Sequence, residues 1–266
     1  MLGSTVPVIS VTRCLSRVLL LLSVIGIILS PRVLFASGKP IVALDIGHLP
    51  SAPGATSARG RGEYFFNKST VEHLYRELKN RDTIGVVVLN SKGDAIALKD
   101  RGAEAARLGA TLLISIHHDS VQPKYLSTWK YQGKELRYSD HFSGYSIFYS
   151  EKNQEPKRSL TAAEFIGDEL RKAGFKPTPH HAEPIQGENR PFIDPFRGIY
   201  RYDDLIVLKS SPAPAVLIEC GIIVNRDEEK KLGSEIYRKR LINAIARGIE
   251  GYLASEFEPQ SREPTT

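Results

Sequence analysis

Short apolar runs alternate with amphipathic segments along most of the chain. The runs span residues 41–48, 84–90, 111–117, 144–150, 204–209 and 215–220. Between them, apolar residues recur at the i, i+3, i+4 and i+7 spacing of a helix face, which predicts helices around 71–78 and over 94–109, 160–173 and 227–252. Thr161 and Glu164 have capping-box spacing and predict the start of the third helix. Strands that alternate with helices predict a single-domain α/β sandwich, with a mostly parallel central sheet flanked by helices.

Two longer stretches show neither a short apolar run nor the helical spacing of apolar residues. Residues 121–143 contain Pro123, Gly133 and scattered aromatic residues, and they are expected to be irregular. Residues 175–202 are rich in proline, and a loop of this length inside a compact domain is usually functional or disordered. We expect this loop to shape the access of substrate, with polar groups from His180, His181, Glu188, Asn189 and Arg190. The alternative is a solvated surface loop.

The first 36 residues have the pattern of a secretory signal peptide. Arg13 and Arg17 precede the apolar run 18–29, and a small-residue cleavage pattern ends at Ala36. The run is short for a membrane span, which needs ~20 apolar residues. We therefore expect cleavage near Ser37 and a periplasmic or secreted protein, with an uncleaved signal anchor as the alternative.

Composition and charge indicate an ordinary globular domain after the signal. Of 266 residues, 25% are charged and 41% are hydrophobic, which excludes a disordered chain. The formal net charge is +6. Three of the basic residues lie before residue 37, where there are no acidic residues, so the rest of the chain has a net charge of only +3. Nucleic acid is therefore not expected as a partner. Residues 37–255 are expected to form one folded domain and 256–266 a polar tail.

Three of the apolar runs end on residues suited to metal binding or acid–base chemistry. The first ends at His48, the third at His117 and the last close to Glu219. In open α/β sheets, ligands bind outside the carboxyl ends of the strands. Catalytic zinc typically has three protein ligands, and Glu63, before the first helix, is the best candidate for the third. Spacing alone leaves alternatives open, because a histidine can cap a strand end and Glu63 can stabilise a helix N-terminus.

Four motifs around these residues occur in a characteristic order. They are DIGH (45–48), GRGEYFFN (60–67), SIH (115–117) and PAVLIECGIIVN (214–225). With these motifs, residues 40–253 resemble the zinc-dependent N-acetylmuramoyl-L-alanine amidases of bacterial cell walls, the amidase-3 type. Ile46 replaces the usual proline of the first motif, and His118 replaces a common alanine after the third.

The resemblance implies a zinc amidase catalytic domain over residues 37–255. His48, Glu63 and His117 would bind one Zn²⁺ per chain, which activates a water molecule. Glu219 would take the proton of that water and pass it to the leaving amine. The bond cleaved would be the amide between N-acetylmuramic acid and L-alanine, in peptidoglycan or in muropeptides, for wall remodelling, daughter-cell separation or turnover.

Three further residues, Asp45, Asn67 and His118, are expected beside the metal ligands or the substrate. Asn67 ends the second motif. His118 is not expected to be a ligand, because neighbouring strand residues point to opposite faces. Asp45 precedes His48 by three residues, and it is expected either to accept a hydrogen bond from that imidazole or to cap the strand end.

Two other functions stay open. A zinc peptidase that cuts within the stem peptide also uses two histidines, a glutamate ligand and a catalytic glutamate. A non-catalytic wall-binding protein is disfavoured because all four key residues are present. We expect a monomer with an open site, since neither 121–143 nor the short connection before residue 160 has the pattern of a plugging helix. The sequence leaves open whether an activator protein is needed.

Overall fold

In the part of the chain that the structure describes, seven strands form the central sheet, in the order β2-β1-β3-β9-β6-β8-β7. Four neighbouring strands run parallel: β2 (Gly85–Leu89), β1 (Ile41–Ile46), β3 (Ala110–Asp119) and β9 (Ala215–Ile222). The sheet is completed by β6 (Ser146–Tyr149), which is antiparallel to β9, and by β8 (Ile199–Arg201) and β7 (Phe192–Asp194). Because β1, β3 and β9 are parallel, their carboxyl ends lie at one edge of the sheet.

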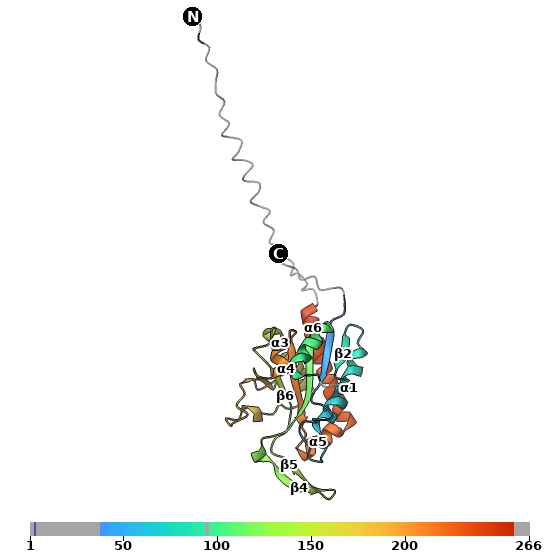
Figure 1. Ribbon diagram of the computed structural model, residues 1–266, viewed down its shortest axis with the longest axis vertical. Coiled ribbons are helices and arrows are strands. Elements are labelled where there is room, and N and C mark those ends of the chain that lie inside the picture. The colour runs from blue at the N-terminus through green and yellow to red at the C-terminus, as the bar shows by residue number, and fades with distance from the viewer. Residues whose placement is uncertain (1–2, 4–37, 94–95, 258–266) are drawn as a thin grey trace. The chain divides into compact units, whose positions relative to one another are not determined.

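Helices cover both faces of this sheet in the computed structural model (Figure 1). One face carries α1 (Glu63–Lys79), α3 (Pro156–Lys172), α5 (Arg226–Gly233) and α6 (Glu235–Phe257). The other face carries α2 (Leu98–Arg107) and α4 (Ile206–Lys209). The expected α/β sandwich with a mostly parallel central sheet is confirmed.

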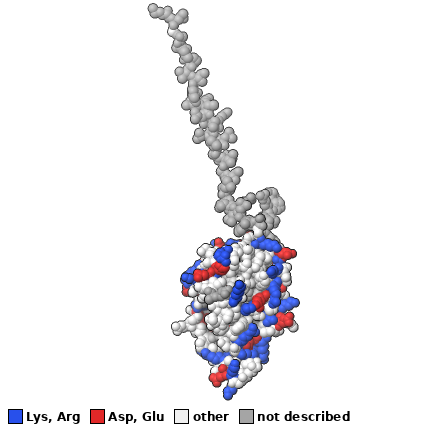
Figure 2. Space-filling view, turned by 45° about the vertical axis from the view of Figure 1, so that its right-hand side comes forward, with Lys and Arg blue, Asp and Glu red and all other residues white. Residues whose placement is uncertain are grey.

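The structure describes residue 3 and residues 38–93 and 96–257. Apart from residue 3, the proposed signal peptide lies outside these ranges, as does the chain beyond residue 257. Within the described ranges, no helix is long and apolar enough to cross a bilayer. On the face shown in Figure 2, basic and acidic side chains are interspersed over the surface, which is the mixed charge typical of a globular protein.

Alternation along β3 assigns its side chains to the two layers. Ile114 and Ile116 pack in the cluster formed with α1, α3 and α6, whereas Leu113 packs in the cluster formed with α2 and α4. By the same alternation, His118 lies on the α1 side of the sheet and His117 on the opposite side. The two adjacent histidines therefore meet different surroundings.

Several element boundaries differ from the sequence expectations. Helix α3 begins at Pro156, a residue favoured in the first turn of a helix, and Thr161 lies inside it with its hydroxyl donating to Lys157 O. The predicted capping box is therefore wrong. The run 204–209 forms the short helix α4, because periodicity cannot separate short apolar strands from short helices. Helix α6 extends to Phe257, past residue 252, where the predicted helix ends.

The stretch 121–143, expected to be irregular, contains a hairpin. A 3-10 turn (Pro123–Tyr125) precedes β4 (Ser127–Tyr131) and β5 (Lys134–Tyr138), which pair antiparallel. Gln132 and Gly133 both have positive φ, as a tight hairpin turn requires. In Figure 1 the hairpin extends beyond the carboxyl edge of the parallel strands.

Candidate metal centre and active site

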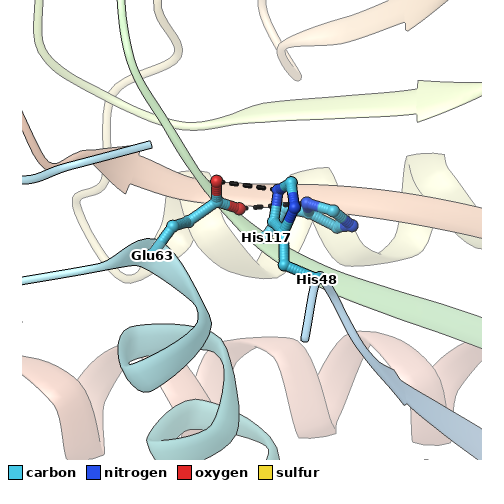
Figure 3. A group of neighbouring side chains, drawn as sticks. All are labelled: His48, Glu63 and His117. Carbon is cyan, nitrogen blue, oxygen red and sulfur yellow. Dashed lines mark hydrogen bonds and ion pairs between the residues drawn. The ribbon is translucent and has the colours of Figure 1, made fainter. Parts of the chain in front are cut away.

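Three side chains with metal-binding groups meet at the carboxyl edge of the parallel strands. His48 follows β1, His117 lies near the end of β3, and Glu63 is the first residue of α1. His48 Nε2 lies 2.9 Å from Glu63 Oε2, and His117 Nδ1 lies 3.0 Å from Glu63 Oε1 (Figure 3). One ligand atom from each side chain lies within 4.8 Å of the other two. The structure thus brings together the three residues that the sequence proposes as metal ligands.

Two glycines leave the space for this approach. A Cβ atom on Gly47 would lie 2.5 Å from the His117 ring, and one on Gly54 would lie 2.4 Å from Glu63 Oε2. His48 itself adopts the left-handed region, with a φ of 65°. Such a backbone costs a non-glycine residue of order 1–3 kcal/mol and is found preferentially at functional sites. The residues around Glu63 are therefore arranged for close contact of its carboxylate with two imidazoles.

The Glu63 carboxylate is held from several directions. Ala55 N donates to Oε2 at 3.1 Å, whereas Asn67 Nδ2 and His118 N donate to Oε1 at 3.1 and 3.2 Å. Burial raises the pKa of Glu63, but its hydrogen bonds with the two imidazoles outweigh burial and bring the pKa below its usual range. Glu63 is therefore a fixed anion at the centre of the cluster.

The loop that precedes Glu63 is tied to its surroundings by hydrogen bonds and an ion pair. Ala58 N donates to Ile223 O at 2.9 Å, and Trp129 Nε1 of β4 donates to Ala58 O at 2.8 Å. Arg59 forms an ion pair with Glu229 of α5. These contacts hold the first turn of α1 over the sheet edge.

Asn67 connects three parts of the centre. Its Nδ2 donates to Gly47 O at 3.1 Å as well as to Glu63 Oε1, and its Oδ1 lies 2.8 Å from His118 Nδ1. Both Asn67 and His118 are buried. Burial lowers the pKa of His118 to about 3, so this imidazole is neutral and donates to Asn67. The structure therefore places both residues behind the Glu63 carboxylate.

Asp45 forms a buried ion pair with Arg101 and makes no hydrogen bond to an imidazole within the described residues. Arg101 Nη1 lies 2.8 and 3.1 Å from its two carboxylate oxygens, and Ser115 Oγ donates to it at 2.7 Å. Arg101 also donates to Ile46 O at 2.9 Å and to His48 O at 3.4 Å. The expectation that Asp45 accepts directly from the His48 imidazole is corrected, because Asp45 acts on the end of β1 through Arg101. Sequence reasoning missed Arg101, since an arginine in an exposed alanine-rich helix usually faces solvent.

Glu219 is the register partner of His117 across the β3–β9 pair. Both residues line a cavity of 240 Å³, together with part of the 175–202 loop. Glu219 Oε2 is buried and has no hydrogen-bond partner within the described chain. Burial raises the pKa of Glu219 well above its usual value, and the carboxylates of Asp119 and Glu63 raise it further. A carboxyl group of this kind beside a cavity is suited to proton transfer.

Three of the loop residues proposed from the sequence lie in the cavity wall. These are His181, Glu188 and Arg190. His181 Nδ1 lies 2.8 Å from Glu188 Oε2, and the Arg190 guanidinium lies 3.6 Å from the centre of the Tyr202 ring. Asn189 is exposed, has a φ of 63°, and is not part of this wall. Its backbone turns the chain between Glu188 and Arg190, and its contact with substrate stays a prediction.

Comparison with known proteins agrees with this geometry. Residues 42–251 match the profile of the amidase-3 family, described as N-acetylmuramoyl-L-alanine amidase. The chain belongs to this family. The family assignment made from the four motifs, and with it the expectation of an amidase, is confirmed.

Individual relatives extend this result. The chain is 28% identical over 249 residues to the N-acetylmuramoyl-L-alanine amidase AmiA of Escherichia coli strain K12, which covers 84% of this chain and 79% of AmiA. The crystal structure of N-acetylmuramoyl-L-alanine amidase from Clostridium difficile 630 matches with a TM-score of 0.62 and 26% identity, over 83% of this chain and 100% of that one. The CwlD amidase from Clostridioides difficile, solved in complex with the GerS lipoprotein, shares the fold, with a TM-score of 0.61, 21% identity, and coverage of 82% of this chain and 100% of CwlD.

Proposed function

We propose that this amidase is zinc-dependent and hydrolyses the bond between the lactyl group of N-acetylmuramic acid and L-alanine in peptidoglycan. The observation that carries the proposal is the convergence of His48, Glu63 and His117, with His117 in the wall of a cavity that Glu219 also lines. Membership of the amidase family supports the bond class. The same observation disfavours a non-catalytic wall-binding protein, which has no need of a proton-transfer group at that place.

The donor set fits Zn²⁺. Two imidazole nitrogens and one carboxylate oxygen are ligands of known catalytic zinc sites, and Gly47 and Gly54 leave the approach to the rings and the carboxylate free of a Cβ atom. The buried Glu219 Oε2 without a hydrogen-bond partner also fits a site that takes up a cation and water. When bound by His48, Glu63 and His117, Zn²⁺ supplies Lewis acidity towards the amide carbonyl and towards water.

Glu219 is the residue that transfers protons in this proposal. Its raised pKa brings the carboxyl group closer to the pH at which it can both accept and donate a proton. It accepts a proton from the attacking water and donates it to the nitrogen of the leaving L-alanine. The glycan then retains a free lactyl carboxyl group, and the peptide is released with a free amino group.

Buried residues behind the ligands position them. Asn67 orients the Glu63 carboxylate, and the neutral His118 ring fixes Asn67. Arg101, held by Asp45, donates to the backbone carbonyl of His48. Partners of this kind fix the orientation of metal ligands and typically contribute 10–100-fold to metal affinity or activity.

The loop 175–202 is proposed to contact the peptide or the sugar. Arg190 lies in the cavity wall with its guanidinium against Tyr202, and a guanidinium in a fixed position binds carboxylates well. The stem peptide of peptidoglycan carries carboxylates. Arg190 is therefore the side chain proposed to bind the substrate from this loop.

The proposal includes export and action as a monomer without an activator. The N-terminal pattern of residues 1–36 supports a periplasmic or secreted location, where peptidoglycan lies. The side chains of His48 and His117 are 35% and 17% exposed, which supports an open site. Because CwlD forms a complex with a lipoprotein, the purified chain is best assayed both alone and with candidate activators.

Digestion of purified peptidoglycan tests the proposal. We expect mass spectrometry to detect intact stem peptides with a free L-alanine amino group. Chelation should abolish the release of these peptides, and added zinc should restore it. Shortened stems that are still attached to sugar would show a peptidase instead. Unchanged peptidoglycan with tight binding would show a wall-binding protein, and activity that requires a partner would contradict the open-site proposal.

A further inference from the structure

A second cluster of two histidines and a carboxylate lies beside the first. Asp119 is the last residue of β3, and His180 and His181 begin the short 3-10 helix His180–Ala182 of the long loop. Asp119 Oδ2 lies 3.2 Å from His180 Nε2 and 2.8 Å from His181 Nε2. One ligand atom from each of the three residues lies within 4.8 Å of the others. Two imidazole nitrogens therefore converge on one carboxylate oxygen, as they converge on the Glu63 carboxylate in the first cluster.

The outer nitrogen of each ring is occupied by another residue. His180 Nδ1 lies 3.0 Å from Thr178 Oγ1, and His181 Nδ1 lies 2.8 Å from Glu188 Oε2. In both rings Nε2 is thus left to face Asp119. Histidines that bind metals are typically fixed in this way, with one ring nitrogen towards the ion and the other bonded to a carboxylate, a hydroxyl or a carbonyl group.

One atom of the cluster is unsatisfied. His180 is 1% exposed, and its Nε2 is buried without a hydrogen-bond partner in the described part of the chain, in spite of its closeness to Asp119. A buried polar atom of this kind is rare in folded proteins and points to a group that protein atoms alone do not provide.

A network of hydrogen bonds alone accounts for only part of this arrangement. A protonated His181 between Asp119 and Glu188 would be satisfied at both nitrogens. It would leave His180 Nε2 unsatisfied, because the two rings lie 3.8 Å apart, centroid to centroid, and both are directed at the same oxygen. A cation bound between the three side chains would use both Nε2 atoms and the carboxylate at once.

We infer that Asp119, His180 and His181 form a second binding site for a divalent transition-metal ion of the Zn²⁺ class. Two imidazoles and a carboxylate select such ions over Mg²⁺ and Ca²⁺, which prefer oxygen ligands. His181 lines the same 240 Å³ cavity as His117 and Glu219. The second ion would therefore lie in the wall of the active-site cavity. This inference goes beyond the proposed function and does not depend on metal binding by the first cluster.

Metal counting on the full-length chain tests the inference. The wild-type protein is saturated with Zn²⁺, separated from free metal and analysed by inductively coupled plasma mass spectrometry. We expect two equivalents in the wild type, and one each in His181→Gln and His48→Gln. We expect none in the double variant and two in His141→Gln, a matched change at an exposed histidine. The absorption spectrum of Co²⁺-loaded protein provides a second measurement, with one component lost in each single variant.

The outcomes separate the two clusters. One equivalent in the wild type that survives His181→Gln and is lost in His48→Gln would overturn the second site. One equivalent lost only in His181→Gln would support the second site and instead contradict the zinc dependence proposed for the first. No bound metal would overturn both. If His181→Gln fails to fold, the metal counts of the other two proteins still decide. A second site requires two equivalents in the wild type and one equivalent in His48→Gln.

Discussion

The two histidine–carboxylate clusters have the same composition but are built from different parts of the chain. In the first, His48, Glu63 and His117 lie at the ends of β1, α1 and β3. In the second, only Asp119 lies on a strand, and His180 and His181 are adjacent residues of a loop. Side chains on regular elements are held more precisely than those on loops. The second cluster must therefore be held by its own contacts, such as the hydrogen bond from Arg190 N to His181 O at 2.7 Å.

The carboxylates of this region also differ in whether an imidazole partner offsets the effect of burial on their pKa. Burial raises the pKa of Glu63 and of Asp119, but imidazole partners outweigh burial and lower the pKa of each below its usual range. For His181, burial lowers the pKa, but Asp119 and Glu188 outweigh it and raise the pKa to about 9. Within the described residues Glu219 has no such partner, and burial raises its pKa. The two compensated carboxylates are thus suited to binding cations and Glu219 to transferring protons, since environments that separate pKa values assign different roles.

Replacing Glu219 gives the largest expected effect. Glu219→Gln removes the proton-transfer group but keeps the size of the side chain, so we expect kcat to fall by ~10²–10⁴-fold. Metal content at both clusters should be unchanged. Glu135→Gln, at an exposed position on β5, is the matched control with wild-type activity. Loss of one equivalent of metal in Glu219→Gln would instead make Glu219 a ligand.

Breaking the buried Asp45–Arg101 pair should destabilise the side of the first cluster that β1 supports. Asp45→Asn leaves the Arg101 charge buried without its anion, and removing one partner of such a pair typically costs about 3–5 kcal/mol. Chemical denaturation measures the free energy of unfolding. Glu104→Gln, which removes an exposed partner of Arg107 in the same helix, should leave it unchanged. Equal stability of both variants would show that the buried pair does not support β1.

Removing Asn67 should weaken metal binding at the first cluster alone. Asn67→Ala deletes the hydrogen bonds to Gly47, Glu63 and His118, and we expect zinc affinity at this cluster to fall by about 10–100-fold. Competition with a chromogenic chelator measures the affinity. Asn80→Ala, at the exposed end of the same helix, is the control. An equal loss at both clusters would show that the clusters are not independent.

Arg190→Ala should have the smallest effect of the four. The side chain lies in the cavity wall and touches neither cluster through its guanidinium in the described contacts. We expect KM for peptidoglycan fragments to rise by about tenfold, the effect of losing one charged contact with substrate, with metal content unchanged. Arg137→Ala, at an exposed position on the hairpin, should behave as wild type. A fall in kcat with unchanged KM would contradict the proposed role in binding.

The sequence by itself determined the fold class and the residues of the first cluster. Apolar runs alternating with amphipathic segments require strands covered by helices. His48, His117 and Glu219 follow or end apolar runs, so the parallel arrangement of these strands is enough to bring them to one edge of the sheet. Glu63 was found by its place before the first predicted helix and by its motif, and α1 brings it to the same edge.

Only the tertiary structure decided which distant polar groups are partners. Asp45 and Arg101 are 56 residues apart, and His181 lies 62 residues from Asp119. No period of 2 or 3.6 relates such positions, because their contact depends on how helix α2 and an irregular loop fold back onto the sheet. For the same reason, His180 and His181 appear in the sequence only as polar residues of a proline-rich loop. Their convergence on Asp119 follows from the path of that loop, which local hydrophobic patterning does not encode.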